Sequence, residues 1–320
     1  MTRHKIHYLK ENKYIYFISK VCVFYLLVFI LDFIIGHGLN YLYFKQESGF
    51  QNRITYAIEK TTEDIIIIGS SRAKHHYVPD ILEQQIHQTC YNAGNNGQHI
   101  FYYEAIIKST LKRYNPKMII LDFKFEEFSK NNDSYDRLSA ILPYYKTHPE
   151  LRPIIKLRSP YEKMKLLSNI YPYNSSILTI FAGNMSFNKK RKTDLKGYVP
   201  LNNTLKKSIN KNSSFVKYDL DSLKIKSYES IIKECIDKKI KLSIICSPYF
   251  IKANNTECSI ITGKQIAKKY NIPFYDYSQD SIFIGNISLF NDETHLNNKG
   301  AKLFSSLIIN KFKHNTIEYK

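Results

Sequence analysis

Apolar residues gather in short runs along most of this chain, and each run is followed by a polar or glycine-containing turn. These runs predict strands over residues 65–68, 90–92, 118–123, 242–246 and 273–275. Between the runs, helical spacing of the apolar positions predicts helices over 100–113, 222–239, 258–270 and 298–312, with one more beginning near Pro79. Short buried strands that alternate with helices indicate βαβ units and a parallel sheet. We therefore expect an α/β fold with about five parallel strands.

The alternation stops in the middle of the chain. Residues 124–221 are rich in Tyr, Asn, Ser and Lys, and six prolines interrupt them, at positions 143, 149, 153, 160, 172 and 200. Proline ends helices and cannot donate to a strand ladder. We interpret this region as a long insertion of irregular helices that covers one side of the functional site.

The N-terminal pattern is apolar over a much longer stretch. Residues 14–36 meet the length of about 20 largely apolar residues that a membrane-spanning helix needs, although Lys20 and Asp32 interrupt them. Lys20 lies near one end, where its long side chain can reach the interface. Asp32 is less favourable, but it lies near the opposite end, where a carboxylate can approach the interface. A cleaved signal peptide is the first alternative, but no small-residue cleavage site follows. A buried helix of a soluble domain is the second.

Flanking charge predicts the orientation of this helix. Four basic residues precede it, at positions 3, 5, 10 and 13, against Lys45 and Arg53 shortly after it. The positive-inside rule then places the N-terminus in the cytoplasm and the large domain outside. The predicted organisation is a cytoplasmic segment (1–13), a transmembrane anchor (14–36), a membrane-proximal stalk (37–60) and a globular domain (61–320).

Composition adds a strongly basic balance. The 320 residues hold 47 Lys and Arg against 28 Asp and Glu, a formal charge of +19, with one local cluster at 189–192. Such a charge attracts nucleic acid, anionic lipid or acidic polysaccharide. No nucleic-acid-binding motif accompanies it, so nucleic acid is the least favoured of these partners. The five cysteines show no Cys-x-x-Cys spacing, which favours buried free thiols over disulfides or a zinc site.

Three residue types that can form a nucleophilic triad occur at opposite ends of the domain. Ser71 follows the strand 65–68 in the turn Gly-Ser-Ser-Arg, and Asp292 and His295 precede the last helix as Asp-x-x-His. A serine becomes a nucleophile when a base takes its proton and a carboxylate orients that base. Each motif also has an ordinary explanation, because Gly and Ser form turns and Asp caps helices. A third motif, the turn 92–97, ends in Gly97, whose amide could donate to an oxyanion or simply serve a flexible loop.

These motifs together resemble the SGNH (GDSL-like) hydrolase superfamily. Gly69-Ser70-Ser71 is similar to its first block, Asn92-x-Gly94-x-x-Gly97 to its second, and Asp292-x-x-His295 to its last. The resemblance covers about residues 60–315 without the insertion. It implies a flavodoxin-like three-layer fold, Ser71 as nucleophile, His295 as general base and Asp292 as its orienting group. It also implies that the Ser71 and Gly97 amides form the oxyanion hole.

Two positions depart from the pattern of this superfamily. Gly-Ser-Ser stands in place of Gly-Asp-Ser, as in membrane-anchored relatives such as the teichoic-acid D-alanine transfer protein. The third block, Gly-x-Asn-Asp, is missing after the strand 118–123, where the chain reads Phe123-Lys124-Phe125-Glu126. Losing one oxyanion donor costs about 10²–10³ in rate. The missing asparagine therefore predicts weak activity or another donor.

The expected function is a membrane-anchored serine esterase or O-acyltransferase acting on an acylated carbohydrate or another cell-envelope polymer. Arg72 is expected to bind an anionic group of the substrate, whereas His75 and His76 more often have structural roles. This chemistry needs neither a metal nor an organic cofactor. Membrane proteins are further candidate partners. The alternatives are an inactive scaffold or glycan-binding protein with the same fold, and a basic protein acting on anionic lipid.

Overall fold

A five-stranded parallel sheet forms the central layer of the globular domain. The computed structural model describes residues 2–189, 194–206, 218–251 and 257–314. Its strands are β1 (Ile65–Ile68), β2 (Cys90–Asn92), β3 (Met118–Asp122), β4 (Lys241–Cys246) and β5 (Phe274–Asp276), in the order β2-β1-β3-β4-β5. This is the flavodoxin-like order, and the α/β class expected from the sequence is confirmed.

Helices cover both faces of the sheet because the strand side chains alternate between two cores. Ile66 and Ile68 of β1 join a core with α5 (Ile100–Arg113), α10 (Ser222–Asp237) and α11 (Cys258–Lys269). Ile65 and Ile67 join the second core on the other face. The helices of that second layer are α3 (Ser71–His76), α4 (Pro79–Ile86) and α12 (Asn298–His314).

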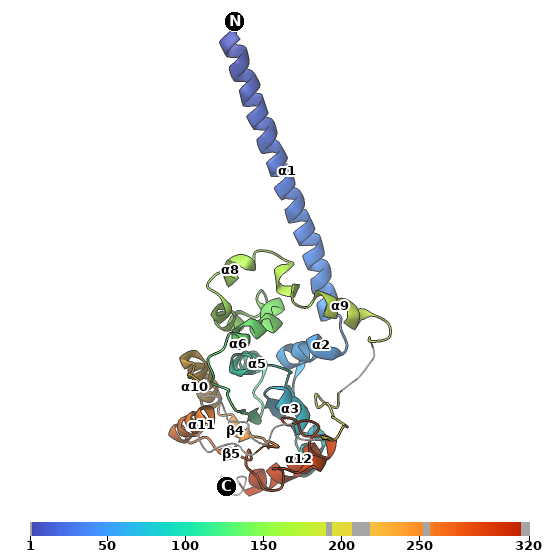
Figure 1. The fold of residues 1–320 in the computed structure, drawn as a ribbon, viewed down its shortest axis with the longest axis vertical. Helices are drawn as coiled ribbons and strands as arrows, with labels where there is room; N and C mark the ends of the chain where they lie inside the picture. The colour runs from blue at the N-terminus through green and yellow to red at the C-terminus, as the bar shows by residue number, and fades with distance from the viewer. Residues whose placement is uncertain (1, 190–193, 207–217, 252–256, 315–320) are drawn as a thin grey trace.

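The N-terminal helix α1 (Thr2–Phe44) extends far from the domain (Figure 1). It is long and apolar enough over Lys13–Phe44 to cross a membrane, and its most apolar window has no buried residues. A signal sequence near the N-terminus would meet the same criteria of length and apolar composition. The helix contacts the domain from Asp32 to its C-terminal end, where Leu39 and Tyr43 are buried.

Part of the segment 37–60, expected as a membrane-proximal stalk, is buried in the domain core. The end of α1 leads into α2 (Gly49–Thr55) and a π-helical turn, Tyr56–Lys60. Ile54, Ala57 and Ile58 are almost fully buried in the core that also holds α5. An apolar spacing of three to four residues explains this burial, since it places these side chains on one helical face.

The region 124–221 contains short helices and no strand of the sheet among its described residues. It includes α6 (Asp133–Asp136), α7 (Arg152–Ile155), α8 (Glu162–Lys165) and α9 (Ile177–Asn184), with four 3-10 turns at 137–144, 149–151, 156–158 and 171–173. Contacts with α1, α2 or α5 are made by α6, α9 and the turns at 137–144, 149–151 and 171–173. Three residues of the basic cluster, 190–192, lie outside the described residues. All five cysteines are free; Cys90, Cys235 and Cys246 are buried as expected, whereas Cys22 is exposed and Cys258 half-buried.

Candidate active site

Ser71 lies at the carboxyl end of β1, where parallel sheets place their ligands. It is the first residue of α3, and the preceding Ser70 caps that helix by accepting a hydrogen bond from the Arg72 amide (3.2 Å). Because Ser70 is the cap, the Ser71 hydroxyl has no structural duty in the helix. An amide at the first helical position also has no carbonyl partner within the helix. Both the hydroxyl and the amide of Ser71 are thus available for chemistry.

His295 meets Ser71 from the loop that precedes α12. Its Nε2 lies 2.8 Å from Ser71 Oγ, although 224 positions separate the two residues. Its Nδ1 lies 2.9 and 3.0 Å from the two carboxylate oxygens of Asp292. A carboxylate only accepts hydrogen bonds, so the Nδ1 proton donates to Asp292 and the Nε2 lone pair faces the serine. The structure therefore brings Ser71, His295 and Asp292 together in the order that a catalytic triad requires.

The Asp292 carboxylate also shapes its own loop. Its Oδ1 accepts hydrogen bonds from the backbone amides of Thr294 and His295, both at 2.9 Å, and from the Thr294 hydroxyl. Partial burial would raise the pKa of Asp292, but the hydrogen bonds from His295 and the Thr294 amide lower it well below its usual value. Asp292 is therefore ionised at neutral pH and can stabilise an imidazolium at His295.

The triad serine and histidine line a cavity of about 410 Å³. Gly97 lies on its wall with a positive φ of 68°, a conformation that favours glycine. A Cβ at this position would come within 2.3 Å of the Arg137 guanidinium of the inserted region. Gly97 thus lies in the cavity that holds Ser71, as the second block of the superfamily pattern requires.

Two aromatic side chains line the cavity of Ser71 near the carboxyl ends of β3 and β4. Phe125 and Tyr249 stack with ring centroids 3.9 Å apart and planes 3° apart, and both line the cavity. They stand after β3 and β4, so the sheet brings them together across 124 positions. Among the described residues of the region 124–221, those that line this cavity are 124–126.

Arg72 has a different set of partners from the substrate anion expected from the sequence. Its side chain is buried, and its guanidinium donates to the backbone carbonyls of Thr294 (2.7 Å), Ser247 (2.6 Å) and Pro248 (2.9 Å). It also lies 3.5 Å above the Tyr249 ring. These contacts join the loop of His295 to the loop after β4. The arrangement makes Arg72 a positioning residue.

A buried polar network that sequence reasoning did not assign supports the same loop. His76 is fully buried; its Nε2 accepts a hydrogen bond from the Leu296 amide (3.0 Å), and its Nδ1 lies 2.9 Å from Ser247 Oγ. Burial lowers the pKa of His76 well below its usual value, so the ring is neutral and its Nδ1 carries the proton. Leu296 follows His295 directly, and His76 therefore fixes the backbone that carries the base.

Asp122 lies beneath this network at the end of β3. Its carboxylate accepts a hydrogen bond from the Tyr77 hydroxyl (2.6 Å), and burial raises the pKa of Asp122 despite the nearby Arg72. The sequence feature that could have identified Asp122 is a charged residue at the end of an otherwise apolar strand. The oxyanion asparagine of the third block has no counterpart here, because the residues after Asp122 are Phe123 and Lys124.

No cluster of three or more His, Cys, Asp or Glu side chains suited to a metal ion occurs among the described residues.

Neither a protein-family model nor a curated protein sequence matches the chain. Among solved structures it is similar to a two-domain esterase active on acetylated mannans, with 13% identity, a TM-score of 0.41, and coverage of 77% of this chain and 47% of the other. It is also similar to an acetyl xylan esterase, with 11% identity, a TM-score of 0.38, and coverage of 77% and 98%. These low scores say nothing about the activity of this chain.

Proposed function

We propose that this protein is a serine esterase or O-acyltransferase, anchored in the membrane by α1 and acting on an acylated carbohydrate of the cell envelope. The observation that carries the chemical part is the continuous hydrogen-bonded chain from Ser71 Oγ through His295 to the Asp292 carboxylate. The resemblance of the three sequence blocks to the SGNH superfamily supports the same assignment. The apolar length of α1 and the basic charge of the chain support the location.

In the proposed mechanism, Ser71 Oγ attacks the carbonyl carbon of the ester while His295 Nε2 takes the hydroxyl proton. The tetrahedral oxyanion is stabilised by the backbone amides of Ser71 and Gly97. Collapse breaks the bond to the alcohol, which leaves with the proton returned by His295, and an acyl-Ser71 remains. Water or a sugar hydroxyl then attacks this ester with His295 again as base. The acceptor decides whether the product is a free acid or a new ester.

A glycan-binding protein without turnover is the second candidate. The observation that favours it is the stretch after β3, where Lys124 and Phe125 stand in place of the third-block asparagine. Phe125 and Tyr249 also line the cavity and add apolar surface to it. For such a protein, binding of a glycan would not depend on the Ser71 hydroxyl.

The deciding experiment is covalent labelling of the full chain in detergent with a fluorophosphonate, measured by intact mass. Wild type is compared with Ser71→Ala, His295→Ala and the control Ser306→Ala, which removes an exposed hydroxyl on α12. We expect one adduct on wild type and on the control, and none on the two triad variants. Hydrolysis of p-nitrophenyl acetate should follow the same order.

Absence of labelling in folded wild type would count against an activated serine. Affinity for acetylated and deacetylated glycan, compared between wild type and Ser71→Ala, would then test the second candidate. Equal affinity of the two proteins would support binding without turnover.

A further inference from the structure

Large apolar side chains are exposed at the end of the domain from which α1 emerges. Two short helices of the region 124–221, α8 and α9, lie at this end (Figure 1). Around α8, Leu167 is 78% exposed and Met164 68%. On α9, Leu178 is 84% exposed. Contiguous exposed apolar surface is unusual on a soluble domain and marks an interaction site.

The exposed residues of α9 share one helical face. Leu178 and Phe181 are three residues apart, which aligns them along the helix, and the exposed C-cap Met185 follows them. Ile180 on another face is fully buried. The helix therefore presents its outer face to the surroundings while its inner face packs on the domain. We call the exposed side chains on and beside α8 and α9 the apolar rim; it consists of Tyr161, Met164, Leu167, Leu178, Phe181, Met185 and Phe187.

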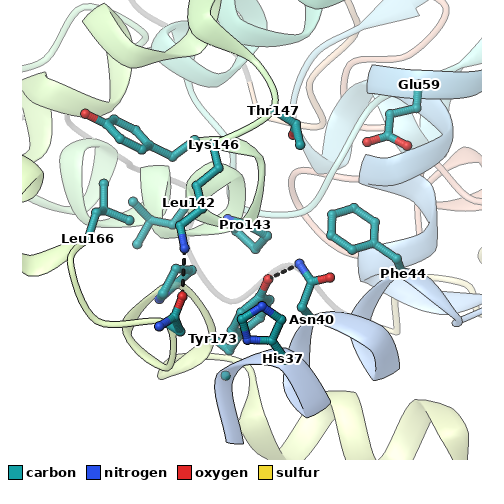
Figure 2. Close-up of a pocket in the computed structure, with 14 residues that line it drawn as sticks. His37, Asn40, Phe44, Glu59, Leu142, Pro143, Lys146, Thr147, Leu166 and Tyr173 are labelled. Carbon is teal, nitrogen blue, oxygen red and sulfur yellow. Dashed lines mark hydrogen bonds between the residues drawn. The ribbon is translucent and has the colours of Figure 1, made fainter. Parts of the chain in front are cut away.

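Helix α1 leaves the domain beside this rim. Gly36 is buried against Asn169, and Asn40 Nδ2 donates to the Tyr173 hydroxyl (2.7 Å) at the edge of a cavity between α1 and the region 124–221 (Figure 2). On the other side, Asn184 of α9 donates to the backbone carbonyl of Leu42 (2.9 Å). From Gly36 toward the N-terminus, the described side chains of α1 are exposed or half-buried.

Asp32 marks the level at which α1 emerges. Its carboxylate accepts hydrogen bonds from the Ser168 hydroxyl (2.5 Å), from the Asn169 amide and side chain (2.7 and 2.9 Å) and from the Ile170 amide (3.2 Å). These donors belong to the segment directly after Leu167. A carboxylate in an apolar helix is costly within hydrocarbon, and here the domain itself supplies its partners. The boundary of the apolar phase therefore lies at the level of this segment.

We propose that the apolar rim is immersed in the lipid interface, so that the domain rests on the bilayer through α8 and α9 while α1 crosses it. The occupant is lipid because both parts of the rim flank the place where the unburied apolar surface of α1 begins: α9 packs against α1, and Leu167 precedes the segment that binds Asp32. Exposed Lys163 lies among the rim residues and suits anionic headgroups. Interfacial segments of this kind enter about 5–10 Å into the headgroup and acyl boundary.

This arrangement shortens the segment that spans the bilayer. With Asp32 at the interface, the spanning part is residues 13–31, close to the length of about 20 residues that a bilayer requires. The inference rests on the anchoring part of the proposed function and is independent of its chemistry. Labelling of Ser71 therefore has no bearing on it.

The chain contains no tryptophan, which makes single-tryptophan variants direct depth probes. The full chain is reconstituted in vesicles with or without brominated acyl chains, and tryptophan emission is recorded. The test variants are Leu167→Trp and Leu178→Trp. Leu27→Trp on α1 is the positive control, and Leu303→Trp on α12, at the far end of the domain, is the matched negative control (Figure 1).

We expect both rim variants to show blue-shifted emission that brominated lipid quenches, though less than Leu27→Trp, while Leu303→Trp is neither shifted nor quenched. Quenching of Leu27→Trp alone would show that α1 is anchored and that the rim faces water, which overturns the proposal. Absence of quenching in all four variants would overturn the anchor and the rim together.

Discussion

Replacing Asp292 with asparagine tests whether the carboxylate controls the protonation of His295. In the native site both carboxylate oxygens face the Nδ1 proton, and Oδ1 also accepts the Thr294 and His295 amides. An asparagine keeps those amide contacts if its carbonyl oxygen takes the Oδ1 position. Its amide nitrogen then stands at the Oδ2 position, 3.0 Å from Nδ1. Two donors would face each other, and the imidazole would move its proton to Nε2.

The size of the effect follows from the geometry and the exposure of the pair. Two unit charges about 4 Å apart interact by about 4 kcal/mol at an effective dielectric of about 20 and by about 1 kcal/mol in water. The Asp292 side chain is 45% exposed, so the lost stabilisation of the imidazolium lies between these limits, at about 2–3 kcal/mol. Since about 1.4 kcal/mol is a factor of ten, this term lowers the rate by about 30- to 150-fold. The unfavourable tautomer adds to it, and we expect a total loss of about 10²–10³.

The assay is kcat/KM for p-nitrophenyl acetate together with the rate of fluorophosphonate labelling. The matched control is Asp280→Asn, because Asp280 also accepts a loop amide, that of Ile282 (2.9 Å), but does not line the cavity of Ser71. Asp280→Asn should leave both rates within about threefold. If Asp292→Asn retains wild-type rates while folded, the carboxylate serves only its loop and the triad assignment is refuted.

Three further predictions concern the framework around the site. Gly94→Ala places a Cβ 2.5 Å from the Lys74 amide nitrogen and should lower the free energy of unfolding in urea by about 1–3 kcal/mol. Gly38→Ala, whose Cβ would have no atom within 4 Å, should not lower it, and equal urea midpoints for the two variants would contradict the packing argument. Arg72→Lys leaves carbonyl acceptors unpaired and should cost about 3 kcal/mol in urea unfolding; an unchanged midpoint would argue against its positioning role. Burial lowers the pKa of His75 to about 4, so between about pH 6.5 and 4 only the unfolded chain gains a proton at this residue. The free energy of unfolding should therefore fall by up to about 3 kcal/mol over this range. His75→Gln should remove that part of the pH dependence, and an unchanged pH dependence would refute the prediction.

Local patterns were sufficient to locate the sheet and its main helices. The apolar run 65–68 and the helical spacing over 100–113 match β1 and α5 residue for residue. These patterns report burial on both faces of a strand or on one face of a helix, and burial is what fixes such elements. The pairing of Asp292 with His295 could also be predicted, because the hydrogen bonds of the Asp292 carboxylate join residues no more than three positions apart.

Hydrogen-bonding and stacking partners that are distant in the chain could not be predicted from the sequence. The charge of Arg72 predicted a substrate anion, yet its guanidinium meets carbonyls about 175 and 222 positions away. Nothing near Phe125 in the sequence indicates that Tyr249 lies flat on it. The same limit applies to residues 37–60, whose apolar spacing was visible but whose packing against α5 depends on the folded domain.

The helix-capping hydrogen bonds beside the site are made by neighbours of the triad residues, which favours an enzyme over an inactive scaffold. Ser70 caps α3, and Asn297 begins α12 by accepting the Gly300 amide (3.0 Å), so neither helix needs Ser71 or the His295 ring. The Asp292 loop contacts would likewise survive without an imidazole at 295. The hydroxyl and the ring nevertheless meet at 2.8 Å on the wall of a cavity. A scaffold would gain little stability from that partly exposed contact, whereas an ester-cleaving site depends on it.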